Sequence, residues 1–298
     1  MVSLVALFVI GLQERDPVAY QKLDYATAAT VPFTTPFSQT PVVEVTLADG
    51  NAYHFDLDTG AAGPGMLDSD IAEKLGLKES GEIEMGDPSG KNNTKSKLYA
   101  LPSLRLGGLT YHDLTVVGGH LRPSKPGMVH IDGVIGLAMY KEMLLRIDYQ
   151  KHEITFSKES MPGDIAAKAV DVSFEDSVPS IYITLPSGDL KAHIDSGSMG
   201  GLLVPEKTAA NLKFIGEPKV VGHARTLFNS FDIHAGRLDG NIQIAGADLK
   251  SPMVEFADMF PVANIGSRVL RNFTIYLDQR INKVAFVASG PVDLALKN

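Results

Sequence analysis

The sequence predicts a mainly β protein in which one structural plan occurs twice. Short runs of alternating apolar and polar residues, separated by turn-forming residues, dominate the chain, and few segments have a helical period. Residues 38–160 and 178–290 share the order of these runs. In each copy an Asp-(Thr/Ser)-Gly tripeptide follows the second run, at 58–60 and at 195–197. The same turn is therefore expected at the same point of two related folding units.

Composition and charge limit the classes of protein that the chain can be. Its 298 residues are 44% hydrophobic and 21% charged, which suffices for a sizeable core in one large domain or two ordinary ones. The net charge of −8 argues against nucleic acid and against an anionic membrane surface as partners. The chain has no cysteine, and its histidines lack the spacing of common metal sites. We therefore expect no metal and no cofactor.

The N-terminal segment, residues 1–37, is expected to lie outside the repeated plan. Residues 1–12 are apolar but too few to span a bilayer, and no other segment could span one. Their length suits the core of a signal peptide, although a basic start and a clear cleavage site are lacking. An export signal or its remnant, a docked strand and a misplaced start all stay open, with export favoured. Residues 13–37 contain several prolines and are expected to be irregular.

The first hairpin of each copy leads directly to the tripeptide. In the first copy, residues 42–47 alternate like a strand, residues 48–51 form a turn, and the next strand ends at Asp58. In the second copy, residues 181–185, the turn 186–189 and the strand 190–194 lead to Asp195. The two aspartates are 195 − 58 = 137 residues apart, so we expect them at equivalent positions.

The later segments keep nearly the same spacing. Residues 104–108 correspond to 242–246, and three further pairs share a shift of 130: 134–136 with 264–266, 144–149 with 274–279, and 154–156 with 284–286. The spacing between equivalent residues therefore falls by about seven residues before the last motifs, because the loop at 119–130 is longer in the first copy. Residues 68–77 and 205–212 are the main predicted helices, with Asp68 and Pro205 as start signals and Gly76 as a stop. Residues 161–177 are expected to link the copies, and 291–298 to form a tail.

A strand that ends in Asp-(Thr/Ser)-Gly is suited to presenting a carboxylate. The glycine permits a tight turn, and the hydroxyl can bond the backbone across it. Two such loops that face each other would place two carboxyl groups a few Å apart, where they cannot both ionise and so share one proton. The ionised carboxyl can then activate a water while the protonated one polarises a carbonyl, without any covalent intermediate.

With these motifs the chain resembles the aspartic peptidases of the retropepsin-like and pepsin-like superfamily. The resemblance covers both copies and rests on the tetrapeptides at 58–61 and 195–198, on the segment 66–77 and on an apolar-apolar-Gly motif at 134–136. The second such motif, 264–266, departs from the pattern because Asn264 replaces an apolar residue. The resemblance implies two acid-protease-type β-barrel lobes related by a pseudo-two-fold axis, with a cleft between them that binds a peptide or protein substrate.

The resemblance also implies roles for the residues of the two tetrapeptides. Asp58 and Asp195 would form the catalytic dyad within a single, monomeric chain. The second residue of each tetrapeptide would form hydroxyl contacts between the loops, and the third would place a backbone N–H near a carboxylate. These supporting residues are Thr59, Gly60, Ala61, Ser196, Gly197 and Ser198.

The fourth position of the tetrapeptide differs between the copies. Ala61 has no side-chain donor, whereas Ser198 has a hydroxyl, and the resemblance to pepsin-like enzymes implies that a hydroxyl at this position can bond the adjacent aspartate. We therefore predict that Asp195 favours the charged form and that Asp58 more often holds the shared proton.

Two other functions stay open at this point. The chain could be a non-catalytic peptide-binding module with the same fold, or each lobe could complete an active site only with a second chain. Two segments are candidates for a hairpin that covers the cleft, 83–90 in the first copy and 220–231 in the second. The first lacks the tyrosine that pepsin-like enzymes usually carry there, so the choice between them and the cleavage specificity stay open.

Overall fold

We analysed a computed structural model of the chain. The structure describes residues 19–25, 27–36, 40–86, 93–121, 130–175, 177–225, 230–258, 261–288 and 290. The apolar stretch 1–12 and the predicted tail 291–298 lie outside this part. Within it, no helix is both long and apolar enough to cross a membrane.

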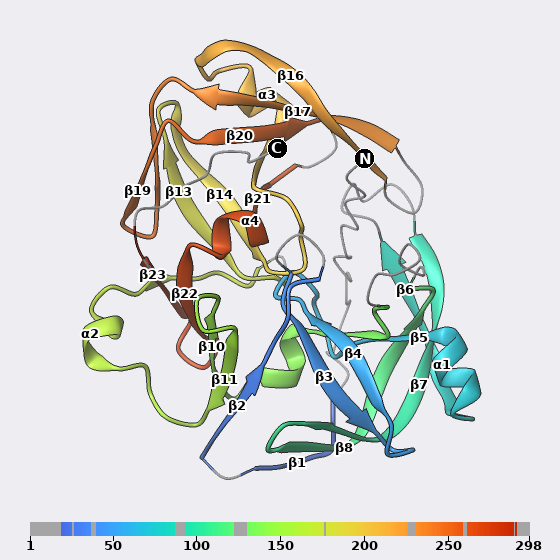
Figure 1. Cartoon of the computed structure of the whole chain (residues 1–298). Helices are drawn as coiled ribbons and strands as arrows, with labels where there is room; N and C mark the ends of the chain where they lie inside the picture. The colour runs from blue at the N-terminus through green and yellow to red at the C-terminus, as the bar shows by residue number, and fades with distance from the viewer. Residues whose placement is uncertain are drawn as a thin grey trace.

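The protein is mainly β, as the sequence predicted, and its strands form three sheets (Figure 1). An eight-stranded sheet holds most strands of the first copy, and a nine-stranded sheet, in the upper part of Figure 1, holds most strands of the second. A six-stranded sheet takes strands from both copies. The aspartates of interest lie where the first two sheets approach each other.

The eight-stranded sheet contains a closed barrel. Its order is β1-β8-β5-β9-β4-β3-β7-β6, and an additional pairing of β7 with β8 closes the six strands from β8 to β7 into a ring. The strands are β1 (Lys22–Asp24), β3 (Val42–Leu47), β4 (Ala52–Leu57), β5 (Gly65–Asp68), β6 (Lys78–Gly86), β7 (Asn93–Leu106), β8 (Leu109–Gly119) and β9 (Gly133–Ile135). Alternation decides which side of a strand faces the barrel core: Tyr53, Phe55 and Leu57 of β4 are buried, and the residues between them are more exposed.

The nine-stranded sheet repeats this arrangement. Its order is β16-β17-β20-β15-β21-β14-β13-β18-β19, so the run from β20 to β18 corresponds strand by strand to the run from β8 to β7. In both sheets the strand before the aspartate runs parallel to the strand of the apolar-apolar-Gly motif. The strands are β13 (Ser180–Leu185), β14 (Gly188–Asp195), β15 (Leu202–Pro205), β16 (Phe214–Arg225), β17 (Ser230–Leu238), β18 (Asn241–Ile244), β19 (Ala247–Lys250), β20 (Met253–Ala257) and β21 (Ala263–Gly266).

In the described part of the chain the second sheet is less regular than the first, so a second closed barrel stays a prediction. Where the first sheet has the long strand β7, the second has the two successive short strands β17 and β18. Where the first has β8, the second has β19 and β20. The interruptions lie at Gly240 and at Pro252, which has no N–H to continue a ladder. Two backbone hydrogen bonds cross the gap, from Leu238 N to Pro252 O (2.9 Å) and from Ser251 N to Gly240 O (3.0 Å).

The third sheet, called the shared sheet below, joins the ends of the two copies. Its order is β12-β23-β22-β10-β11-β2, and β10 pairs antiparallel with β22. The predicted boundaries placed residues 144–157 and 273–288 in separate lobes, whereas the structure pairs them. The strands are β2 (Ala28–Pro32), β10 (Leu144–Asp148), β11 (Glu153–Ser157), β12 (Val170–Asp171), β22 (Phe273–Asp278) and β23 (Lys283–Ala288).

The expectation that residues 13–37 are irregular was wrong for the two strands β1 and β2. β1 pairs with β8, and β2 pairs with β11 at the edge of the shared sheet. Ala29 and Val31 of β2 are buried while the three alternating residues of the strand are exposed, which is the pattern of a strand with one face on the core. Pro32 is tolerated because an edge strand does not need every N–H for pairing.

Both predicted helices exist but are shorter than predicted. α1 (Ser69–Lys74) begins after Asp68, whose side chain accepts a hydrogen bond from the Asp70 N–H at 3.1 Å. α3 (Glu206–Ala209) begins after Pro205. The remaining helices are η1 (Leu137–Tyr140), α2 (Gly163–Ala166) and α4 (Ser267–Leu270).

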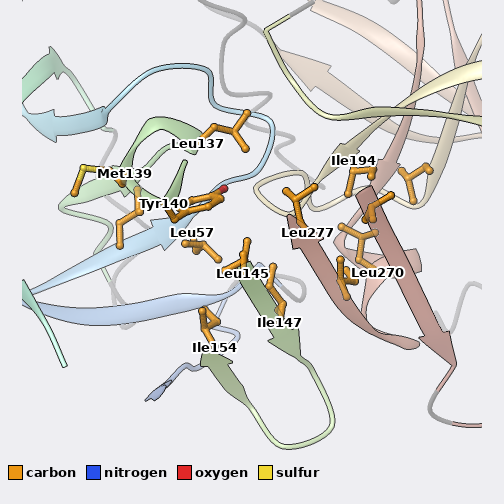
Figure 2. Close-up of a cluster of buried hydrophobic side chains, with 14 of the residues drawn as sticks. Leu57, Leu137, Met139, Tyr140, Leu145, Ile147, Ile154, Ile194, Leu270 and Leu277 are labelled. Carbon is orange, nitrogen blue, oxygen red and sulfur yellow. The ribbon is translucent and has the colours of Figure 1, made fainter. Parts of the chain in front are cut away.

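The hydrophobic core continues from the two lobe sheets into the shared sheet. Leu57 and Ile194, the residues directly before the two aspartates, belong to one cluster with Leu145, Ile147 and Leu277 of the shared sheet (Figure 2). Leu57 and Ile194 are almost completely buried. Burying such a side chain contributes about 1.5–3 kcal/mol. The burial of these two residues therefore fixes the backbone next to each aspartate.

Candidate active site

Asp58 and Asp195 occupy equivalent places in the two lobe sheets. Asp58 directly follows β4, and its N–H donates to Ile135 O of β9 at 3.1 Å. Asp195 ends β14 and lies beside Gly266 of β21 in the parallel ladder. Because each strand is paired on both sides and its last apolar residue is buried in the core, each aspartate is presented from the end of a rigid strand.

The two loops that carry the aspartates, 58–61 and 195–198, are tied together by reciprocal hydrogen bonds. Thr59 Oγ1 donates to Ile194 O at 2.7 Å, and Ser196 Oγ donates to Leu57 O at 2.6 Å. In return, each hydroxyl accepts from the N–H of the other residue, at 3.0 Å in both directions. Thr59 and Ser196 are almost inaccessible to solvent. Water cannot easily replace these bonds, so the relative position of the two loops is fixed.

The glycines of the two loops allow each carboxyl group to lie against the opposite loop. A Cβ atom at Gly60 would come within 2.7 Å of Asp195 Cγ, and one at Gly197 would overlap the carboxyl group of Asp58. The negative charge of Asp195 acts on Asp58, so the two carboxyl groups lie close together. The structure thus brings Asp58 and Asp195 of one chain to the same place, with no room for a side chain at either glycine.

Asp58 is in an environment that favours its neutral form. It is 1% exposed, and the Gly60 N–H donates to its Oδ1 at 2.7 Å. Burial raises the pKa of Asp58 well above its ordinary value, and the negative charges of Asp195 and then Asp56 raise it further. These surroundings favour the protonated form of Asp58.

Asp195 has more support for its charged form. Burial raises its pKa, but this rise is opposed first by the hydrogen bond from Asn264, then by the Ser198 N–H and then by Asp58. Asn264 Nδ2 donates to Asp195 Oδ2 at 2.9 Å, and Ser198 N donates to Oδ1 at 2.8 Å. Asp195 therefore accepts hydrogen bonds on both of its carboxyl oxygens, whereas Asp58 accepts one from Gly60; which of the two aspartates holds the proton stays a prediction.

The source of this inequality differs from the prediction. We expected the hydroxyl of Ser198 to bond Asp195, whereas that oxygen accepts a hydrogen bond from Gly200 N at 3.3 Å, and the backbone N–H of Ser198 bonds the carboxylate. The expected contact of the Gly197 N–H is likewise replaced by that of Ser198. The additional donor is Asn264, which the sequence showed only as a departure from the family motif.

Two further ionisable residues near the dyad were not singled out from the sequence. Asp56 and His193 lie two residues before the aspartates, 193 − 56 = 137 residues apart, so they occupy equivalent positions. Strand alternation places them on the same face as Asp58 and Asp195. Burial and the charge of Asp195 raise the pKa of Asp56 well above its ordinary value. The signal that could have found both residues is their regular spacing from the tripeptides.

A second layer of hydrogen bonds supports the loop 195–198 from behind. Ser267, the first residue of α4, donates from its hydroxyl to Ser196 O at 2.5 Å. The Tyr149 hydroxyl lies 3.4 Å from Ser267 Oγ, and it comes from the turn after β10 of the shared sheet. The shared sheet therefore braces the loop as well as the core beneath it.

A hairpin of each lobe packs beside the loop of the same lobe. Met85 of β6 belongs to a buried cluster with Ala61 and Val134, next to the loop 58–61. Ile233 of β17 belongs to a corresponding cluster with Leu203, against which Met199 packs. Residues 87–92 and 226–229 of the two hairpins lie outside the described part of the chain. The choice between the two as a cover for the site stays open.

Comparison with known proteins supports the peptidase-like reading of the first copy. Residues 43–139 match the family model of aspartyl proteases. The matched range contains the tetrapeptide at 58–61 and the motif at 134–136, and supports an aspartic peptidase family. No curated protein matched the chain. Among the residues that the structure describes, no group of three or more histidine, aspartate or glutamate side chains is placed to hold a metal ion.

Proposed function

We propose that the protein is an aspartic endopeptidase in which Asp58 and Asp195 activate a water molecule. The observation that carries this proposal is the reciprocal hydrogen bonding of Thr59 and Ser196, which fixes two buried carboxyl groups against each other. Two carboxyl groups held in this way share a proton, and one of them is ionised. Such a pair can act as a base and an acid in one step.

In this reaction the unequal environments assign the roles. The Asp195 carboxylate takes a proton from the water, whose oxygen attacks the carbonyl carbon of the peptide bond. Asp58 donates its proton to the carbonyl oxygen, which stabilises the tetrahedral intermediate. When the C–N bond breaks, Asp195 returns the proton to the leaving amine and Asp58 recovers its own. No covalent bond to the protein forms at any stage.

We infer that the substrate is an extended peptide that lies between lobes 38–160 and 178–290, related by a pseudo-two-fold axis through the dyad. The corresponding strand orders of the two lobe sheets and the equivalent contacts of the two loops support this relation. An extended peptide can add to strand edges through backbone hydrogen bonds, with side chains providing specificity.

The first experiment is digestion of a peptide library by the purified protein at a series of pH values. Wild-type protein should cleave, and a statine-type transition-state inhibitor should block cleavage. Asp58→Asn and Asp195→Asn should abolish hydrolysis while peptide binding persists. Asp113→Asn is the matched control, because Asp113 is an exposed residue of β8 with a positive φ, which asparagine adopts readily. Binding without cleavage by a well-folded wild type would favour the peptide-binding alternative.

The remaining alternative requires two chains for one site. Because the loops that carry Asp58 and Asp195 are joined by hydrogen bonds within a single chain, we propose that one chain is sufficient. Specific activity should then stay constant on dilution, and the solution mass of the active species should be that of one chain. Loss of activity on dilution, together with a dimeric mass before dilution, would favour a site that is completed by association.

A further inference from the structure

Asn264 makes a contact with the dyad that has no counterpart in the other lobe. It lies on β21, which runs parallel to β14 with Asn264 beside His193 and Gly266 beside Asp195. This register places the Asn264 side chain on the face that carries Asp195, and its Nδ2 donates to Asp195 Oδ2 at 2.9 Å. The equivalent residue of the first copy is Val134, which has no side-chain donor.

The hydrogen bonds to the two carboxyl groups differ by this one donor. The loop backbone donates one N–H to each carboxyl group, from Gly60 to Asp58 Oδ1 and from Ser198 to Asp195 Oδ1. Asn264 adds a second protein donor to Asp195, on the other oxygen. Both oxygens of Asp195 are thereby held, which fixes the plane of its carboxyl group as well as supporting its negative charge.

Folding stability does not account for an asparagine at this position. Asn264 Oδ1 is buried without a hydrogen-bond partner in the described part of the chain, and a buried polar atom in this state disfavours folding. Val134 shows that a valine fits the equivalent place in a parallel ladder of the same kind. The favourable contact of Asn264 is the one with Asp195.

We propose that Asn264 is a positioning residue that keeps Asp195 ionised and orients its carboxylate toward the attacking water. The inference rests on the proposed function, since it assigns a role in that reaction. In this role Asn264 does not touch the reacting atoms. It allows Asp195 to remain a base at lower pH than burial next to a second carboxyl group would otherwise permit.

Other ionisable groups also face Asp195 in the described part of the chain. They are Asp58 and Asp56 from the first lobe, His193 from β14 itself, and Tyr149 from the turn after β10. Substitution of Asn264 leaves all four in place. A change in the titration of Asp195 after that substitution would therefore be attributable to the lost hydrogen bond.

The test compares Asn264→Val, which copies the first lobe, with Asn264→Asp, which keeps the shape but loses the donor when ionised. The first readout is the pH dependence of kcat/KM on a peptide from the library digest. We expect the acidic limb of the Asn264→Val profile to move up by about one to two pH units, the effect of one hydrogen bond to a charged group. We expect kcat to fall at acidic pH with little change in KM, and a larger upward shift for Asn264→Asp.

The matched control is Asn241→Val, at an exposed position of β18 in the same sheet, and its profile should equal that of the wild type. The second readout needs no substrate: 13C NMR of labelled aspartate carboxyl groups gives the titration midpoint of Asp195 directly. An upward shift in Asn264→Val is expected there too, whether or not the wild type cleaves peptides. Absence of wild-type cleavage with this NMR shift would overturn the proposed function but support the contact. An unchanged midpoint and an unchanged acidic limb in folded Asn264→Val would overturn the role of Asn264.

Discussion

Removing the hydroxyl of Ser196 should destabilise the protein by an amount that follows from its hydrogen bonds. Ser196→Ala removes the bond to Leu57 O (2.6 Å) and the acceptor of the Thr59 N–H (3.0 Å), at a site closed to solvent. One lost hydrogen bond contributes about 0.5–1.5 kcal/mol, and a buried group left without a partner costs about 1–3 kcal/mol. We therefore expect a loss of about 2–4 kcal/mol in the free energy of unfolding.

Urea unfolding monitored by circular dichroism measures this loss from the midpoint and slope of the transition. Ser180→Ala is the matched control, because Ser180 is also buried but within the described residues its hydroxyl makes one long bond, to Val178 O at 3.4 Å. The control should lose less than about 1 kcal/mol. A loss for Ser196→Ala no larger than that of the control would show that the hydrogen bonds of the Ser196 hydroxyl do not stabilise the fold.

Thr59→Val extends this experiment into a double-mutant cycle. The two hydroxyl groups hold the same two loops together through different hydrogen bonds, so either single substitution already weakens the contact between the loops to which the other residue contributes. The double variant should lose less stability than the sum of the two single losses, by about 0.5–3 kcal/mol. Strict additivity would mean that the two residues act independently.

Three further predictions concern the surroundings of the dyad. Because the pKa of Asp58 is raised by folding, the folded protein binds more protons than the unfolded chain above about pH 4, and its stability falls as the pH rises toward the folded pKa. Asp58→Asn should therefore raise the melting temperature at pH 7 more than at pH 4, and an equal effect at both would argue against a raised pKa. Asp56→Asn removes a charge that raises the pKa of Asp58, so the alkaline limb of the kcat/KM profile should move to lower pH; an upward or absent shift would count against this contact. Gly60→Ala would place Cβ 2.7 Å from Asp195 Cγ and should cost about 1–3 kcal/mol in urea unfolding, whereas Gly163→Ala, with nothing within 4 Å, should cost nothing; equal effects would contradict the close approach.

The local elements could be predicted from the sequence because their signals are local. Alternation and turn residues located β3 with β4 and β13 with β14, and the start signals Asp68 and Pro205 located α1 and α3. The equal spacing of the tripeptides indicated that the two aspartates would be equivalent, and their loops are indeed in contact. These features depend on periods of two or 3.6 residues and on fixed turn chemistry.

The features that sequence reasoning missed depend on pairing between distant segments. Nothing local in residues 144–148 shows that they pair with 274–278, because an apolar strand can complete either its own lobe or a common sheet. β2 was not predicted because a run of five residues that ends in a proline shows too short an alternation to indicate a strand. Its pairing with β11 becomes visible only in the structure. The contact of Asn264 depends on the register of β21 against β14, which the sequence does not specify.

If Asp58 and Asp195 act as one catalytic unit, as we propose, the kcat/KM values of four proteins will show it. These are the wild type, Asp58→Asn, Asp195→Asn and the double variant, each verified as folded and assayed on one cleaved peptide across pH. We expect a bell-shaped profile for the wild type and the same residual rate for all three variants, because the effects of residues that act as a unit are not additive. Measurable cleavage that falls step by step from the single variants to the double variant would contradict it, and so would a folded wild type that cleaves at no pH.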